Sequence, residues 1–203
     1  MKGTTPYGQL PVMVVDGQTY AQSEAMLRYV CCASWYYVST RACGPTHSPL
    51  LLFRYMGSVS GMYPRDDLVK CFRIDEMIGL VGDLQAAVRP SMLVGRDPSL
   101  TKEQKAAKTK ELREAFCNTE LPKFLGHFER KLKAEGSGFL VGRMPTIADC
   151  TLLVTLRWLT RGILDHVPVT CLAAYPEVSA FKARMEGLPR IKSWYANGGK
   201  MVY

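Results

Sequence analysis

The sequence predicts an α+β protein in which a small unit of strands and one helix precedes an all-helical domain. Near the start, a β-branched run, an Asp-Gly pair and a second short run form the pattern of a hairpin. From residue 66 onward, apolar side chains recur at helical spacing. The chain has 203 residues, of which 47% are hydrophobic and 22% charged, as in an ordinary globular protein with a sizeable core.

The opening unit is expected to consist of two strands, a tight turn and a helix. Leu10–Val15 is the first strand, Asp16-Gly17 favours a type I′ turn, and Gln18–Ala21 is the second strand. A helix follows from Ser23, whose hydroxyl is suited to cap the first backbone N–H groups. Apolar and aromatic side chains on neighbouring turns continue this helix: Ala25, Met26 and Tyr29.

The stretch from Val30 to Tyr55 interrupts this organisation. Residues 30–54 contain no Asp or Glu but three of the seven cysteines, and show neither strand nor helix periodicity. The tripeptide 27–29 (Leu-Arg-Tyr) is echoed at 53–55 (Phe-Arg-Tyr), and joining Tyr29 to Met56 gives a natural helix end. We therefore interpret 30–55 as an insertion, either a surface loop or an unspliced intron or gene-model error. The composition favours the second, because exposed loops rarely carry so many aromatic and cysteine residues with so few acids.

The rest of the chain is expected to be helical. A first long helix covers 67–92, and Thr101–Gln104 is a capping box that opens a second. Pro122 should kink or divide that second helix. Thr146–Asp149, another box of this type with a structural role, opens a further helix through Leu159. Two short helices close the chain: 178–186 and 188–196.

Apolar stripes give the first two helices a buried face. In the first helix the stripe is Leu68, Cys71, Phe72, Met77, Leu80, Val81 and Leu84. In the second it is Leu112, Phe116, Leu121, Phe124, Phe128 and Leu132. Tryptophans such as Trp158 and Trp194 are interpreted as core residues rather than ligand contacts, since that is the commoner role of large apolar side chains.

Charge and cysteine usage favour a cytoplasmic protein without a nucleic-acid, membrane or metal partner. The formal net charge is +8, but the Lys and Arg residues are scattered and interleaved with Glu, as on solvated helix faces. Such a charge would still attract anionic small molecules. The seven cysteines form no metal-like pairs and argue against a disulfide framework. No signal peptide or membrane-spanning run is visible.

Two short motifs of the opening unit could form half of a ligand site. Pro11 lies between a loop and a strand, where a cis peptide bond would turn the Leu10 backbone towards a ligand. Gln22 and Ser23 stand at a helix N-terminus, where backbone N–H groups favour a carboxylate. Taken alone, a trans proline and a simple N-cap serine are the commoner interpretations.

Taken in order, these motifs resemble the glutathione site of cytosolic glutathione transferases. The similarity is greatest to the sigma class, which includes the glutathione-dependent prostaglandin D synthases. It covers the chain except for 30–55. The segments that carry it are 2–11, 14–17 and 22–29 in the opening unit, and then Asp75–Leu84, Phe139–Gly142, Thr146–Asp149, Tyr175-Pro176 and Leu188-Pro189.

The resemblance implies an incomplete thioredoxin-like domain over 1–64 and an all-α glutathione transferase C-terminal domain over 65–203. The first strand, first helix and second strand of the thioredoxin-like domain have no counterpart in the chain. Lys2 would pair with the glycine carboxylate of glutathione, and Asp83 would reach the γ-glutamyl amine held by the neighbouring subunit of a homodimer, unless it is a solvated helix aspartate. The residues implied to bind glutathione are Lys2, Gln9, Leu10, Pro11, Gln22, Ser23 and Asp83.

The resemblance also implies a reaction, the conjugation of the glutathione thiol to electrophilic or hydrophobic small molecules in detoxification. In the family a Tyr or Ser hydroxyl near the first strand lowers the thiol pKa, so that the nucleophilic thiolate is populated. No residue here matches that hydroxyl, because Tyr7 matches a different aromatic of the family, and no catalytic residue is assigned. We therefore expect very low activity for this chain by itself. The alternatives are a non-catalytic binding or dimerisation protein and an incomplete gene product.

Overall fold

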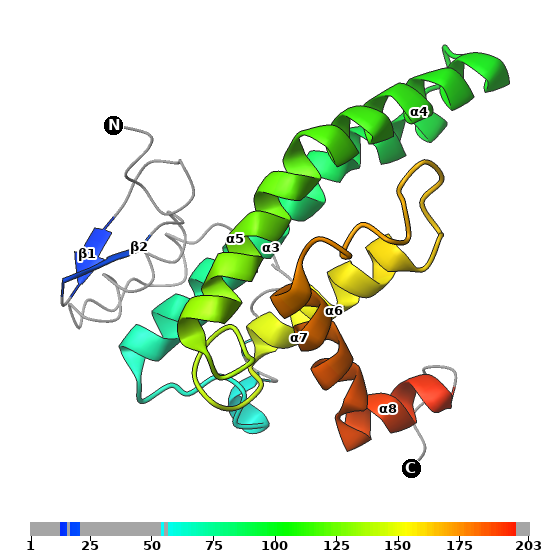
Figure 1. Ribbon diagram of the computed structural model, residues 1–203. Helices are drawn as coiled ribbons and strands as arrows, with labels where there is room; N and C mark the ends of the chain where they lie inside the picture. The colour runs from blue at the N-terminus through cyan, green and yellow to red at the C-terminus, as the bar shows by residue number, and fades with distance from the viewer. Residues whose placement is uncertain (1–12, 16, 21–53, 55–56, 198–203) are drawn as a thin grey trace.

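The computed structural model describes residues 13–15, 17–20, 54 and 57–197 (Figure 1). Two short strands and a series of helices make up these ranges. In chain order they are β1 (Met13–Val15), β2 (Gln18–Tyr20), α3 (Leu68–Leu93), the 3-10 helix η2 (Val94–Arg96), α4 (Lys102–Asn118), α5 (Glu120–Glu135), α6 (Ile147–Thr160), α7 (Pro176–Gly187) and α8 (Pro189–Ala196).

The two strands form the predicted hairpin. They pair antiparallel, with Met13 opposite Tyr20 and Val15 opposite Gln18, so that the hairpin turn falls between Val15 and Gln18. Gly17 has φ of 76°, a backbone conformation that glycine adopts without steric conflict. The helix expected from Ser23 and the proposed insertion 30–55, apart from Arg54, lie outside the described residues.

Local capping chemistry sets the start of α3, and the prediction of a helix over 67–92 is confirmed. The Asp67 carboxylate accepts a hydrogen bond from the Lys70 N–H at 2.9 Å. Most of the predicted stripe is buried, but Leu68 is 37% exposed, and the prediction of its burial was wrong. Leu68 is the first residue of the helix, where fewer neighbouring turns cover a side chain.

The second predicted helix is divided into α4 and α5, as the position of Pro122 indicated. Thr101 and Gln104 form the capping box of α4: the Gln104 N–H donates to Thr101 Oγ1, and the Thr101 N–H donates to Gln104 Oε1 at 2.9 Å. The helices separate at Thr119, and Pro122 falls in the first turn of α5. A proline is tolerated there because its missing N–H would have no partner within the helix. Gly136, in the left-handed conformation, ends α5.

The core lies between α3, α5, α6 and α7. In Figure 1, α5 lies across α3 and α7 lies beside α6, and these pairs are in contact. Large apolar side chains from all four helices are fully buried. Representative members are Phe72 and Met77 of α3, Leu125 and Phe128 of α5, Leu152 and Leu156 of α6, and Phe181 of α7. Across the described ranges, we find no helix with the length and apolar content needed to cross a membrane.

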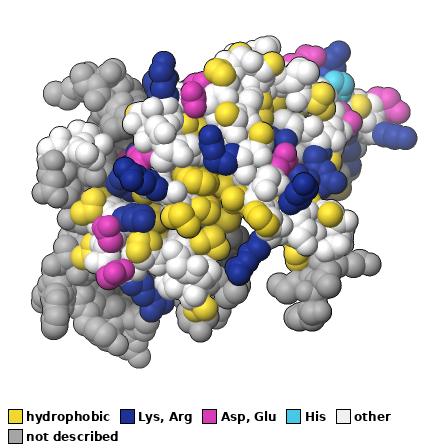
Figure 2. Space-filling view, turned by 60° about the horizontal axis from the view of Figure 1, so that its bottom comes forward, with side chains coloured by type: hydrophobic (Ala, Val, Ile, Leu, Met, Phe, Trp, Pro, Cys, Tyr) yellow, Lys and Arg dark blue, Asp and Glu magenta, His cyan; other side chains and the backbone are white. Residues whose placement is uncertain are grey.

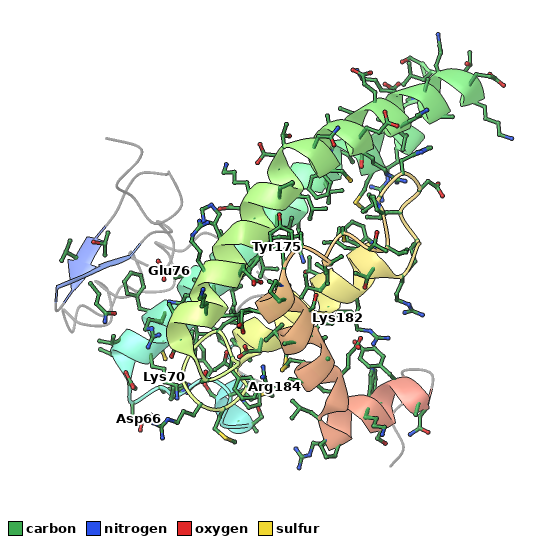
Figure 3. All side chains as sticks on the ribbon, viewed as in Figure 1. Asp66, Lys70, Glu76, Tyr175, Lys182 and Arg184 are labelled. Carbon is green, nitrogen blue, oxygen red and sulfur yellow. The ribbon has the colours of Figure 1, made fainter. Side chains whose placement is uncertain are left out.

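A buried carboxylate joins the start of α6 to the loop that precedes it. Asp149 is 0% exposed and accepts three hydrogen bonds: from the Leu140 N–H at 2.8 Å, from the Thr146 N–H at 2.7 Å and from Thr146 Oγ1 at 2.7 Å. Burial raises the pKa of Asp149, and the hydrogen bonds oppose that rise. On α7, Arg184 (Figure 3) donates to the Gly138 carbonyl of the same loop at 2.9 Å. The predicted box therefore has a structural role.

A second cluster attaches the segment before α3 to the helical domain. Arg54 Nε donates to Asp75 Oδ1 at 2.9 Å, and the Tyr63 hydroxyl donates to the other carboxylate oxygen at 3.2 Å. Burial and the nearby Asp75 raise the pKa of Tyr63. Gly57 packs close to α6, because a Cβ placed on it would lie 2.6 Å from Ile147 Cγ2. These contacts fix residue 54 and the segment from 57 against α3 and α6.

Candidate functional site

An apolar groove of about 560 Å³ lies between the C-terminal half of α3 and that of α6. Its volume falls within the range of roughly 300–1,000 Å³ that is usual for small-molecule sites. The residues that line it are Gly82, Gln85, Ala86, Arg89 and Met92 of α3, and Val154, Thr155 and Trp158 of α6. This groove is the best candidate for a binding site among the described residues.

Helical spacing explains how the sequence builds the groove. On α3, positions 82, 86 and 89 and positions 85, 89 and 92 are spaced by three or four residues, so the two overlapping sets share one face. Small residues leave space on this face: nothing lies within 4 Å of where a Cβ on Gly82 would be, and Ala86 carries only a methyl group. On α6, Val154 and Trp158 are one turn apart. Gly82 and Ala86 of α3 thus leave room beside Val154 and Trp158 of α6.

One hydrogen bond crosses the groove. Gln85 Nε2 donates to Thr155 Oγ1 at 2.9 Å, and that hydroxyl in turn donates to the Thr151 carbonyl at 3.0 Å. Thr155 is buried, so this bond satisfies polar groups that would otherwise be costly inside the protein. The two side chains are therefore already engaged with each other.

Arg89 is the one charged side chain among the described residues that line the groove. It is exposed and forms no hydrogen bond or ion pair with any other residue that the structure describes. On the face shown in Figure 2, apolar side chains gather toward the middle, and Lys and Arg side chains lie around them. The groove can hold an apolar molecule, but its lining, as far as the structure describes it, includes no cysteine, histidine or carboxylate to act as nucleophile or base.

Only one of the predicted glutathione contacts belongs to the described part of the chain. Asp83 follows Gly82 on α3 and is half-buried, so the structure places it next to the groove in sequence but not among its lining residues. The structure therefore does not test the glutathione-binding assignments. The other six lie outside the described residues: Lys2, Gln9, Leu10, Pro11, Gln22 and Ser23.

Among the described residues, the cysteines and acids do not form a catalytic or metal-binding site. Burial raises the pKa of the Cys117, Cys150 and Cys171 thiols, which disfavours the reactive thiolate. Within the same ranges, no group of three or more His, Cys, Asp or Glu side chains is placed to hold a metal ion.

Sequence reasoning missed the groove residues. Trp158 was interpreted as core, yet it is half-buried and lines the groove, and Trp194 on α8 is 40% exposed. The available signal was the stripe of small and polar residues on α3, beside the apolar stripe that packs into the core. That stripe alone does not reveal which helix lies opposite.

A comparison with protein families identifies the helical domain. The model of the glutathione S-transferase C-terminal domain matches residues 97–198, half of the chain. The chain belongs to the glutathione S-transferase family. Among curated members, it is 27% identical to glutathione S-transferase 1 of Ascaris suum over all 203 residues, covering 80% of that protein. It is 25% identical to glutathione S-transferase alpha-1 of Rattus norvegicus over 198 residues, which cover 98% of the chain and 70% of that protein.

Solved glutathione S-transferase structures share this fold. A prostaglandin synthase D of Nilaparvata lugens superimposes with a TM-score of 0.60 at 23% identity, covering 100% of this chain and 79% of that one. The monomeric glutathione S-transferase Na-GST-3 of the hookworm Necator americanus gives 0.54 at 22% identity, with coverage of 100% and 80%. The expected all-helical transferase domain is thus confirmed, whereas these likenesses do not single out the sigma class.

Proposed function

We propose that this protein is a glutathione transferase that joins the glutathione thiol to electrophilic or hydrophobic small molecules. The observation that carries the proposal is the apolar groove between α3 and α6 in a member of this family. Its lining, formed by Ala86, Met92, Val154 and Trp158 among others, suits an acceptor with a largely apolar body. Detoxification of such molecules in the cytoplasm is the corresponding cellular role.

The glutathione half of the site is assigned to the opening unit. We propose that Lys2, Gln9, Leu10, Pro11, Gln22 and Ser23 hold the peptide within a thioredoxin-like domain over 1–64, with 30–55 as an insertion and 65–203 as the helical domain. The sequence pattern of a turn, a strand and a helix N-terminus supports this assignment, because backbone N–H groups there favour a carboxylate. We also propose that the protein belongs to the sigma class of the family.

Asp83 is assigned a role across a homodimer. Its place on α3, half-buried and one residue from the groove, supports a carboxylate that reaches the γ-glutamyl amine bound by the neighbouring subunit. A charge-assisted hydrogen bond of this kind would link glutathione affinity to dimer formation.

Paired variants test the glutathione site. Gln22→Ala and Ser23→Ala should each reduce retention on immobilised glutathione, because each removes a hydrogen bond to the γ-glutamyl end. Ser193→Ala, on the exposed face of α8, is the matched control and should be retained like the original chain. Unchanged retention of both first variants would overturn the assignment.

A second measurement tests the groove as the acceptor site. Ala86→Phe should fill part of the groove and weaken binding of a chloronitrobenzene acceptor, while retention on glutathione stays the same. We expect low turnover of that acceptor by residues 1–203, because the described side chains that line the groove offer no proton acceptor for a thiol. Turnover comparable to that of other glutathione transferases would contradict this expectation.

A non-catalytic binding protein is the second candidate function. It is favoured by the groove lining, in which the described side chains offer apolar contacts and one cation but no proton acceptor for a thiol. Binding of glutathione and of an acceptor without any conjugate, measured by mass spectrometry of the products, would support it over the transferase.

A further inference from the structure

The groove contains an uncompensated positive charge beside an apolar surface. Arg89 stands one turn along α3 from Gln85 and three residues before Met92, and all three side chains line the groove. In the described part of the chain its guanidinium has no ion-pair partner. The polar pair Gln85 and Thr155 is already hydrogen-bonded, which leaves Arg89 as the charged group available to a ligand among the described lining residues.

Charge complementarity indicates what this arrangement would bind. A molecule with an apolar body can pack against Ala86, Val154 and Trp158. A carboxylate at one end of that molecule can form two parallel hydrogen bonds with the planar guanidinium, a geometry that a neutral hydroxyl cannot match. An apolar wall on one side of the pair also lowers the local dielectric and so strengthens the attraction relative to bulk solvent.

We propose that the groove selects amphipathic anions, and that Arg89 is the residue that makes this selection. The ligand class is a medium-chain carboxylic acid, or an acceptor of that shape bearing an electrophilic carbon. This proposal rests on the proposed function in taking the groove as the acceptor site, and it adds the chemical class of the acceptor.

General electrostatic attraction must be separated from selection by one residue. The chain carries a formal net charge of +8 and would draw in any anion to some degree. Arg190 on α8 is also exposed, lies outside the groove, and like Arg89 forms no ion pair with another described residue. Arg190→Gln therefore removes the same charge without touching the groove, and is the matched control.

Binding can be followed through the intrinsic fluorescence of Trp158, with no glutathione present. Decanoate and decanol are suitable probes, because they share one apolar chain and differ mainly in the charge of the head group. We expect decanoate to bind roughly fivefold more tightly than decanol, as for one partly exposed ion pair. Arg89→Gln should remove that preference, Arg89→Lys should keep part of it, and Arg190→Gln should leave it intact. Trp158→Phe should abolish the groove signal.

Other outcomes separate this inference from the proposed function. Equal binding of decanoate and decanol by the original chain would overturn anion selection, while leaving the groove as an apolar acceptor site. An equal loss of preference in Arg89→Gln and Arg190→Gln would also overturn it, because the effect would then be one of net charge. If neither probe changed the Trp158 signal, both this inference and the acceptor site would fall, and the Gln22 and Ser23 variants would still test glutathione binding.

Discussion

Asp149→Ala should destabilise the helical domain more than any exposed substitution. The carboxylate is fully buried and accepts hydrogen bonds from the Leu140 N–H, the Thr146 N–H and the Thr146 hydroxyl. Alanine would leave those three donors without their acceptor and would leave a cavity where the carboxylate was. The loop before α6 would then lose its attachment to the first turn of that helix.

The magnitude follows from the three bonds and from the cost of burying the charge. A hydrogen bond to a charged group contributes about 1.5–3 kcal/mol, and the three are not additive because they share one carboxylate. Burial opposes them, since it raises the pKa of Asp149 and so disfavours the charged form. We expect a net loss of about 3–5 kcal/mol, as for breaking other buried charged networks. For a chain of this length that corresponds to a decrease in Tm of roughly 6–20 °C.

Urea unfolding followed by circular dichroism measures this loss directly. Asp66→Ala, which removes an exposed aspartate just before α3, is the control and should change stability by less than about 0.5 kcal/mol. Asp149→Asn should fall between the two, because an amide keeps one acceptor oxygen but turns an N–H₂ group toward the remaining donors. A loss of less than about 1 kcal/mol in Asp149→Ala would refute the reasoning, since the desolvation cost would then cancel the hydrogen bonds.

Two further predictions concern packing and pH. Gly57→Ala should lower the free energy of unfolding by about 1–3 kcal/mol, because the new Cβ would lie 2.6 Å from Ile147 Cγ2. Gly95→Ala is the control and should be tolerated, because nothing lies within 4 Å of its Cβ. Equal unfolding midpoints of the two variants would contradict this. Burial, then Arg130 and Lys123, lower the pKa of His127, whose Nδ1 accepts a hydrogen bond from Arg130 at 2.7 Å only when the ring is neutral. The pKa of His127 in the folded protein therefore lies below its value in the unfolded chain. Neutral His127 stabilises the fold above about pH 6.5, and this stabilisation is lost as the pH falls through the folded pKa. His127→Gln should lose less stability than the original chain between about pH 7.5 and 5 in urea titrations, and an equal loss would exclude this role.

The helix ends and the hairpin could be predicted because short-range chemistry determines them. Asp67, Thr101 and Pro122 each mark a boundary through a backbone group within a few residues: Asp67 and Thr101 are N-caps in the structure, and Pro122 lies in the first turn of α5. The hairpin of β1 and β2 is predicted in the same local way, from the Asp-Gly pair in the sequence between the two strands.

The groove could not be predicted, because it depends on how α3 and α6 pack against each other. Trp158 has the same sequence signature whether it enters the core or borders a cavity, and only the opposite wall of Ala86 and Arg89 decides between them. The glutathione motif identified the family without that information. The glutathione contacts that we assign to residues other than Asp83 remain predictions, because those residues belong to the part of the chain that the structure does not describe.

The ion pair between Arg54 and Asp75 bears on the proposal that residues 30–55 are an insertion. Arg54 stands two residues before Met56, and Arg28 would stand in the same place if Tyr29 were joined directly to Met56. A splice junction at either copy of the repeated Arg-Tyr would therefore leave Asp75 with an arginine at the same spacing. Transcripts that differ in which copy they keep would encode an arginine at the same distance before Asp75.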